Sequence, residues 1–118
     1  VNYTVQVSDV SALPEGAVGN EADKLFDGDL STFYKPNRAP QSGEAININV
    51  KHLQPKKMEV YQQTVSGAIL TALLSDGSEQ EIGKLEKNYF GAQIPEDTVI
   101  IKITWADVLP EINEIIFS

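Results

Sequence analysis

Short runs of alternating polarity recur along the whole chain, and they constrain the fold more than any other feature. In "AININV" (45–50), Ile46, Ile48 and Val50 fall on one side of an extended segment. A similar run, "NYTVQV" (2–7), lies near the start of the chain. Others follow residues 45–50 at roughly ten-residue spacing, namely "KMEVYQ" (57–62), "ILTALL" (69–74), "QEIGKL" (80–85), "TVIIKITW" (98–105) and "EIIFS" (114–118). The one helical candidate, "NEADKLF" (20–26), is short enough to be a single turn, with Asn20 as its N-cap. The pattern predicts an all-β fold, an antiparallel β-sandwich.

Turn residues separate these runs in the way that a sandwich requires. "SDGS" (75–78) predicts a hairpin turn between two of the strands, with Gly77 free to adopt a positive φ. The prolines that fall between strands, where a missing N–H costs no ladder bond, are Pro36, Pro40, Pro55, Pro95 and Pro110. We find no internal repeat or linker, so residues 1–118 are predicted to form a single domain.

Composition excludes several functional classes. The chain has 118 residues and no cysteine, so it can build a core without disulfides and cannot form thiolate zinc sites or use a cysteine nucleophile. Its 17 acidic and 9 basic residues give a net charge of −8, which repels phosphate backbones and anionic lipids. No apolar run approaches the roughly 20 residues of a membrane span. We therefore expect neither nucleic-acid binding nor membrane insertion.

The segment "KLFDGDLSTFY" (24–34) combines hard oxygen ligands with core-type aromatic residues. A calcium-binding EF-hand needs glycine at the sixth loop position and glutamate at the twelfth. Counted from Asp27, these positions are Thr32 and Arg38, so the segment is not an EF-hand.

Three other interpretations of the same segment remain. Asp27-Gly28-Asp29 matches the Asp-x-Asp of haloacid-dehalogenase-type phosphotransferases, but those enzymes need alternating strands and helices that this chain lacks. The residues Asp27, Asp29 and Thr32 lie within six positions and can direct oxygens toward one calcium ion without an EF-hand. A solvated acidic turn without a ligand is the third interpretation.

Taken with the rest of the chain, this segment points to a known family. "KLFDGDLSTFY", the "SDG" hairpin and the terminal "NEIIF" (113–117) occur in an order and spacing that resembles discoidin-like (coagulation factor C-type) domains. Within that superfamily the chain looks most like the family 32 carbohydrate-binding modules of secreted bacterial glycoside hydrolases. The resemblance covers nearly the whole chain and implies a galactose-binding-like jelly roll. One departure is Tyr34, where many relatives carry tryptophan.

The resemblance also implies one structural calcium ion. By position, its ligands would be the Lys24 carbonyl, the Asp27 carboxylate, an oxygen of Asp29, and the Thr32 carbonyl and hydroxyl. The carbonyl of Asn113 and the carboxylate of Glu114 would complete the shell from the last strand. Phe26, Phe33 and Tyr34 would then anchor the loop in the core, and the ion would stabilise the domain without a role in catalysis.

Catalysis is not expected. Glycosidases use paired carboxylates, and Glu111 and Glu114 are the nearest such pair, but the resemblance assigns Glu114 to the metal. The only histidine, His52 in "VKHLQP", is a weak candidate for a catalytic base.

A sugar site needs an aromatic ring and a few planar polar groups, and several loops offer them. The candidates, each of which also has a purely structural interpretation, are Asn37, Arg38, Gln62, Gln63, Thr64, Tyr89, Phe90 and Trp105. Because adjacent residues of a strand point to opposite sides, at most one of Tyr89 and Phe90 would face a ligand if they lie in a strand.

These observations predict a non-catalytic, calcium-stabilised module that binds galactose- or N-acetylhexosamine-type glycans. Its expected partners are a glycan and the other modules of its parent enzyme, and we expect a monomer. By resemblance, its location would be extracellular, in a secreted or surface-attached bacterial protein. The alternative is a structural or protein-interaction discoidin module without a sugar site.

Overall fold

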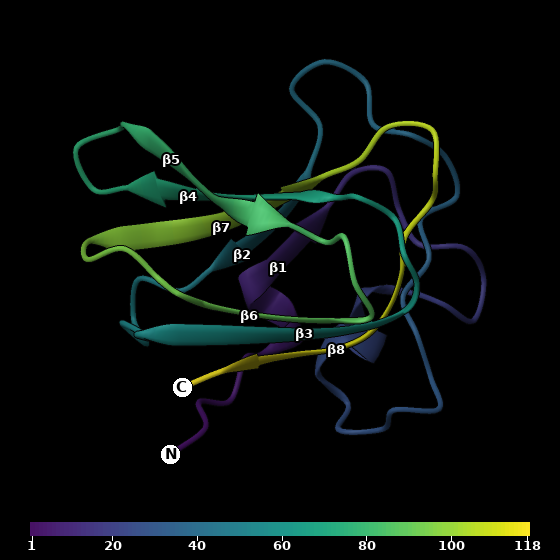
Figure 1. Ribbon diagram of the computed structural model, residues 1–118, viewed down its shortest axis with the longest axis horizontal. Helices are drawn as coiled ribbons and strands as arrows, with labels where there is room; N and C mark the ends of the chain where they lie inside the picture. The colour runs from purple at the N-terminus through teal and green to yellow at the C-terminus, as the bar shows by residue number, and fades with distance from the viewer.

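The computed structural model describes all residues, 1–118, as a β-sandwich of two antiparallel sheets (Figure 1). The elements in chain order are η1 (Val7–Asp9), β1 (Val10–Ala12), η2 (Ala22–Phe26), β2 (Ile46–Asn49), β3 (Lys57–Thr64), β4 (Ile69–Leu74), β5 (Glu79–Lys84), β6 (Tyr89–Gln93), β7 (Thr98–Thr104) and β8 (Glu111–Phe117). The two η elements are short 3-10 helices. No helix is long and apolar enough to span a membrane.

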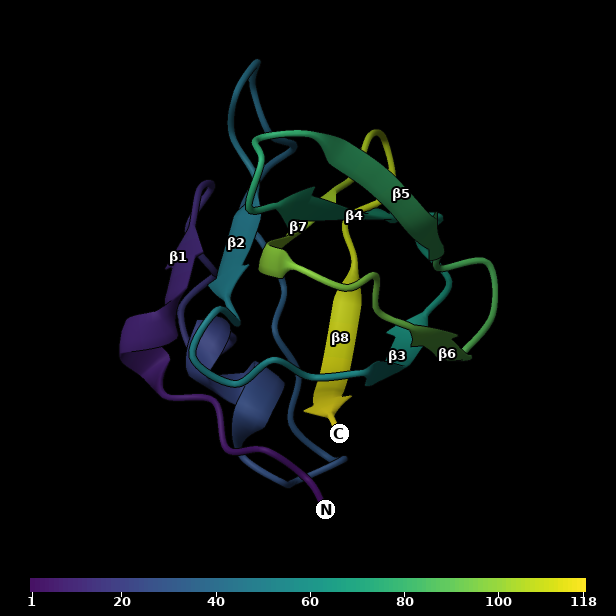
Figure 2. The same cartoon turned by 90° about the vertical axis from the view of Figure 1, so that its left-hand side faces the viewer.

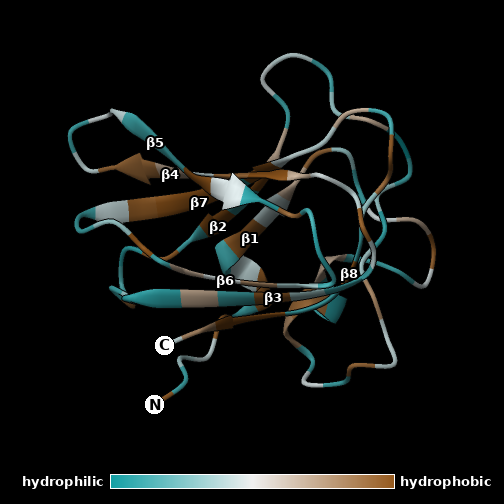
Figure 3. Ribbon diagram, viewed as in Figure 1, coloured by the Kyte–Doolittle hydropathy of each residue, from teal (hydrophilic) through white to brown (hydrophobic).

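The two sheets differ in size. One has five strands in the order β1-β2-β7-β4-β5, and the other has three in the order β6-β3-β8. The core between them is formed by alternate residues of facing strands, such as Ile46 and Ile48 from β2 against Met58 and Val60 from β3. Figure 3 shows β2, β4 and β7 of the five-stranded sheet largely in brown, whereas β3 and β5 contain hydrophilic, teal segments. The predicted antiparallel β-sandwich is therefore confirmed.

The β4–β5 hairpin has the predicted turn. Gly77 adopts a φ of +88°, its N–H donates to the Leu74 carbonyl at 2.9 Å, and the Leu74 N–H donates to Ser78 at 2.8 Å. Asp76 accepts hydrogen bonds from both the amide and the hydroxyl of Ser78. A residue with a side chain at position 77 would be strained in this conformation.

The amino-terminal segment differs from the sequence-based prediction. Residues 2–7 do not form a strand, because only Tyr3 pairs with β8, through a hydrogen bond from its N–H to the Phe117 carbonyl at 2.9 Å. Only Val5 of this segment is buried, so the alternation there does not mark a core strand. The short β1 was not predicted. Figures 1 and 2 both show the two chain ends close together beside β8.

The helical candidate at residues 20–26 forms only the single turn η2, and Asn20 is not its N-cap. The side-chain amide of Asn20 instead donates to the Phe33 carbonyl at 3.1 Å, and Glu21 occupies the N-cap position.

Candidate functional site

The acidic loop 24–34 packs along the free edge of β8, which is an edge strand of the three-stranded sheet. Leu25 and Tyr34 are fully buried, and the Phe26 ring stacks on Phe117 with 6.5 Å between ring centroids. Tyr34 also forms a bridge with Ile112 of β8, and its hydroxyl donates to the Pro14 carbonyl. Phe33 is half-buried. Aromatic residues therefore hold the loop in place, as the sequence predicted, while the acids between them stay near the surface.

A β-bulge in β8 brings Asn113 and Glu114 to this loop. Gln62 pairs with Ile112 and Tyr61 pairs with Glu114, so Asn113 is an extra residue without a partner on β3. The bulge explains why residues 112–115 are all buried, since a regular strand would turn alternate side chains to opposite faces. The Asn113 amide nitrogen lies 3.1 Å from the carbonyl oxygens of both Leu30 and Thr32. This side-chain link between loop and strand was not predicted from the sequence.

Glu114 is buried and has no cationic partner. Both of its carboxylate oxygens accept the N–H of Gly28 at 3.2 Å. Burial, together with the nearby Asp27 and Asp29, raises the pKa of Glu114 to about 7. No lysine or arginine forms an ion pair with Asp27, Asp29 or Glu114. A positive ion at this point would relieve the repulsion between these acids.

The loop offers hard oxygen donors to such an ion. The Thr32 hydroxyl contacts the Asp27 carboxylate and lies 3.0 Å from the Asp29 carbonyl. The Asp29 carboxylate instead accepts hydrogen bonds from Ser31, and the Lys24 ammonium pairs with Asp23, which leaves their carbonyls as possible ligands. The carboxylates do not converge as a cluster of three. The donors fit an oxygen-coordinated cation whose shell is completed by carbonyl groups and water.

Two of the predicted sugar-binding aromatic residues pack into or against the core. Trp105 is only 6% exposed and its indole N–H donates to the Arg38 carbonyl at 3.3 Å, so it presents no ring at a loop apex. Phe90 packs against the core, and its ring lies against Gly83, where a Cβ atom would be only 2.7 Å away. Trp105 is therefore corrected from a candidate platform to a core residue, and Phe90 to a half-buried residue that packs against the core.

The predicted pair Asn37 and Arg38 lies in the long loop before β2. The Arg38 guanidinium binds both carboxylate oxygens of Glu44, at 2.7 and 3.0 Å, and this contact lowers the pKa of Glu44 to about 2. Asn37 is exposed, and its N–H donates to the Glu15 carbonyl. Neither residue lies in the hollow that contains Tyr89.

Gln63 and Tyr89, by contrast, share one open hollow of about 320 Å³ on the three-stranded sheet. Its lining consists of Leu30, Tyr61, Gln62, Gln63, Asn88, Tyr89 and Asn113. Tyr89 is 45% exposed, and its ring lies 5.2 Å from that of Tyr61, its cross-strand neighbour. Its hydroxyl donates to Glu59 at 2.7 Å. Tyr61 was not predicted, because its proximity to Tyr89 depends on the pairing of β3 with β6. Asn88, which precedes Tyr89 in the chain, was not predicted either.

Glu111 is held in a polar cluster beside this hollow. Its carboxylate accepts hydrogen bonds from Thr64 at 2.6 Å and Gln63 at 3.2 Å and pairs with Lys35 at 3.0 Å. These contacts lower the pKa of Glu111. A glycosidase acid needs a raised pKa, so the contacts oppose that role for Glu111. His52 faces Asp9 at 3.3 Å, on the short loop between β2 and β3.

Comparison with solved structures identifies the class of this fold. No protein-family model matches the sequence, and no curated protein matches it either. Structural similarity is nevertheless extensive. CpGH89CBM32-4 from Clostridium perfringens, solved in complex with GlcNAc-α-1,4-galactose, is 15% identical with a TM-score of 0.75, over 98% of this chain and 90% of the other. The family 32 module of C. perfringens NanJ, in complex with galactose, is 15% identical with a TM-score of 0.69, over 99% and 98%.

A third similar structure places the same fold inside a larger chain. The family 89 glycoside hydrolase of C. perfringens, in complex with PUGNAc, is 19% identical with a TM-score of 0.72, over 100% of this chain and 14% of the enzyme. The fold is thus a discoidin-like β-sandwich. More narrowly, it is the fold of the family 32 carbohydrate-binding modules, as the sequence resemblance predicted.

Proposed function

We propose that this domain is a non-catalytic carbohydrate-binding module that directs a secreted bacterial glycoside hydrolase to its substrate. The observation that carries the proposal is the hollow around Tyr61 and Tyr89. There, the exposed Tyr89 and the half-buried Tyr61 lie beside the amides of Gln63 and Asn88, on a fold shared with family 32 modules. Aromatic rings pack against the apolar faces of sugars, and planar amides bind their hydroxyl groups.

Galactose- and N-acetylhexosamine-containing glycans are the proposed ligands. An open hollow covers only one face of a sugar, and each hydroxyl exchanges water for a hydrogen bond worth about 0.5–1.5 kcal/mol net. We therefore expect dissociation constants of about 10 μM to several mM. Other modules on the same chain would raise the effective affinity.

Binding and its location can be tested together. A glycan array would identify ligands, and calorimetry would measure their affinities for the wild type, Tyr89→Ala and Tyr89→Phe. Loss of the ring should weaken binding by about tenfold or more, which corresponds to at least about 1.4 kcal/mol. The matched Tyr89→Phe variant keeps the ring and loses only the hydroxyl bonded to Glu59, so it should bind nearly as well as the wild type. A domain that binds no glycan would favour the structural or protein-interaction alternative.

We also propose that calcium is the cation held by loop 24–34. The ligands would be the Asp27 and Glu114 carboxylates, the Thr32 hydroxyl, and carbonyl groups of Lys24, Asp29, Thr32 and Asn113. The unpaired, buried Glu114 beside two further acids supports this proposal. The ion would connect the loop to β8 and stabilise the native state, without taking part in any reaction.

A further inference from the structure

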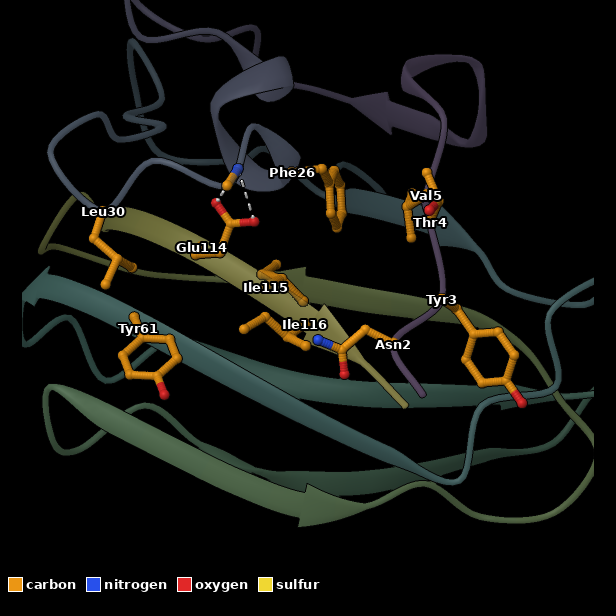
Figure 4. Close-up of a pocket in the computed structure, with 11 residues that line it drawn as sticks. Asn2, Tyr3, Thr4, Val5, Phe26, Leu30, Tyr61, Glu114, Ile115 and Ile116 are labelled. Carbon is orange, nitrogen blue, oxygen red and sulfur yellow. Dashed lines mark hydrogen bonds between the residues drawn. The ribbon is translucent and has the colours of Figure 1, made fainter.

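Leu30 is the one aliphatic residue that lines the proposed sugar hollow, and it belongs to the acidic loop. Its side chain is 59% exposed, and Figure 4 shows it extending from the loop toward the ring of Tyr61. Leu30 and Tyr61 also line a neighbouring cavity of about 410 Å³, which reaches the amino-terminal segment at residues 2–5. The two side chains therefore form a small apolar patch that the fold leaves uncovered.

The position of Leu30 is fixed by Asn113. The side-chain nitrogen of this buried residue lies 3.1 Å from the Leu30 carbonyl and 2.8 Å from Oε1 of Gln63. One amide thus connects the tip of the acidic loop to a polar side chain of the hollow. The contact between Leu30 and the hollow follows from the β8 bulge, which directs Asn113 toward the loop.

The hollow also offers free hydrogen-bond acceptors. The side-chain nitrogens of Asn88 and Asn113 donate within the protein, that of Asn88 to the Gln62 carbonyl at 3.0 Å. The side-chain oxygens of both asparagines accept no hydrogen bond from the protein. Since no buried side-chain polar atom lacks a partner, the oxygen of the buried Asn113 is open to solvent, and Asn88 as a whole is exposed. A ligand that fits here carries an N–H or O–H donor close to an apolar group.

An acetamido group has this combination, because its N–H is a donor and its methyl group is apolar. A sugar hydroxyl supplies the donor without the methyl group. Burial of one methyl group against Leu30 and Tyr61 corresponds to an affinity gain of about fourfold. No charged residue lines the hollow, which also favours an uncharged substituent.

We infer that the hollow binds N-acetylhexosamines in preference to the corresponding hexoses. The acetamido methyl group contacts Leu30 and Tyr61, and the acetamido N–H donates to the side-chain oxygen of Asn88 or Asn113. The inference rests on the proposed glycan-binding function. It adds the class of sugar and assigns a ligand contact to a residue of the acidic loop.

Two matched pairs of sugars test this preference, namely N-acetylgalactosamine against galactose and N-acetylglucosamine against glucose. The members of each pair differ only in the substituent at C2. For the pair that binds, calorimetry should show the N-acetylated sugar bound about fourfold more tightly or better. Leu30→Ala should remove this difference and change the affinity for the plain hexose by less than about twofold.

The exposure of Leu30 keeps this variant informative, because the loss of an exposed side chain should leave the fold and its melting temperature unchanged. Val18→Ala is the matched control. It removes another exposed aliphatic side chain from a loop, but Val18 does not line the hollow, so the variant should bind both sugars like the wild type.

Nuclear magnetic resonance of the wild-type domain provides a measurement that needs no variant. Nuclear Overhauser effects should connect the acetamido methyl protons of the bound sugar with the methyl groups of Leu30. Equal binding of both members of a pair, in a manner that depends on Tyr89, would overturn the inference and leave the proposed function intact. So would a preference for the N-acetylated sugar that survives in Leu30→Ala. Absence of binding to all four sugars would overturn the inference, and absence of binding across the glycan array would overturn the proposed function as well.

Discussion

The outer faces of the two sheets differ in what they expose. On the five-stranded sheet, Asn47, Lys102 and Thr71 lie side by side on β2, β7 and β4, and Lys102 forms an ion pair with Glu79 at 3.0 Å. A polar outer face of this kind is expected for an antiparallel sheet with one solvated side. The three-stranded sheet instead carries Tyr61, Tyr89 and Ile116 on its outer face, beside open cavities.

This difference indicates which of the two outer faces is the better candidate for a ligand-binding surface. Scattered aliphatic residues such as Leu73 and Ile100 on the five-stranded sheet are half-buried and need no special explanation. The apolar surface of β8 is covered by η2 and by residues 2–5, but the region around the two tyrosines stays open. Aromatic rings that lie beside polar side chains and remain uncovered indicate a binding surface.

The largest effect that we expect is on the free energy of unfolding, and it distinguishes aromatic residues of the core from those on the outer face of the three-stranded sheet. Trp105→Ala should lower the free energy of unfolding by about 3–5 kcal/mol, since it removes a large buried side chain and leaves a cavity. The matched variant Tyr89→Ala should change stability far less, because Tyr89 is exposed. Urea denaturation measures both. A Trp105→Ala protein that has wild-type stability but does not bind sugars would contradict the buried position of Trp105.

The next effect concerns the ion that we propose on the three-stranded sheet. Removal of calcium with a chelator should lower the melting temperature by several degrees, because an ion at about 100 times its dissociation constant stabilises the native state by about 2.7 kcal/mol. Asp27→Ala should be less stable than the wild type in calcium and insensitive to the chelator. Glu81→Gln, on the exposed edge strand β5, is the control and should respond like the wild type. Identical melting curves with and without chelator, and no metal by elemental analysis, would refute the proposal.

The pH dependence of stability should also differ between two acids, Glu114 and Glu44. The pKa of Glu114 in the metal-free native state is about 7, above its ordinary value of 4.5, so its contribution to stability is present at low pH and is lost as pH rises from about 4.5 to about 7. For Glu44 the pKa is about 2, so its contribution is present above 4.5 and is lost as pH falls toward 2.

Urea titrations in chelator at a series of pH values would measure this contrast. Between about 4.5 and 7, Glu114→Gln should remove the decline in stability that the wild type shows. Below 4.5, Glu44→Gln should reduce the loss of stability and leave the higher range unaffected. A wild-type stability that rises steadily between 4.5 and 7 in chelator would contradict the assignment to Glu114.

The fold could be predicted from the sequence because its core strands have strict alternation. The alternation of apolar and polar residues is sufficient to assign Ile46 and Ile48 to the core. The turn residues of "SDGS", with Gly77 able to adopt a positive φ, are sufficient to predict the hairpin turn. The segment 2–7 has the same alternation, but a sequence does not reveal that β8 offers it only one pairing position, at Tyr3. Local pattern identifies a strand only where a neighbouring strand is present.

The binding surface was harder to predict because it depends on register and on one bulge. Tyr61 and Tyr89 are 28 positions apart and become neighbours only through the pairing of β3 with β6. The extra residue Asn113 turns consecutive side chains of β8 toward the acidic loop. No residue of "INEIIF" predicts this bulge. Trp105 was misassigned because its partner is a main-chain carbonyl, that of Arg38, which leaves no trace in the sequence.

The smallest effect that we expect is on the dissociation constant for sugars, and it tests whether they bind on the face of the three-stranded sheet or at the loop that contains Arg38. Arg38→Ala breaks an exposed ion pair with Glu44, and such surface pairs contribute little to stability. Glu44→Gln is the matched control, because it breaks the same pair and keeps the guanidinium. If sugars bind on the three-stranded sheet, neither variant should change the dissociation constant by more than about twofold, less than 0.5 kcal/mol. If Arg38→Ala abolishes binding or changes which sugar is preferred while Glu44→Gln does not, the guanidinium itself contacts the sugar. The binding site would then lie at the long loop before β2, as the sequence also allowed, and the hollow around Tyr89 would not be the primary site.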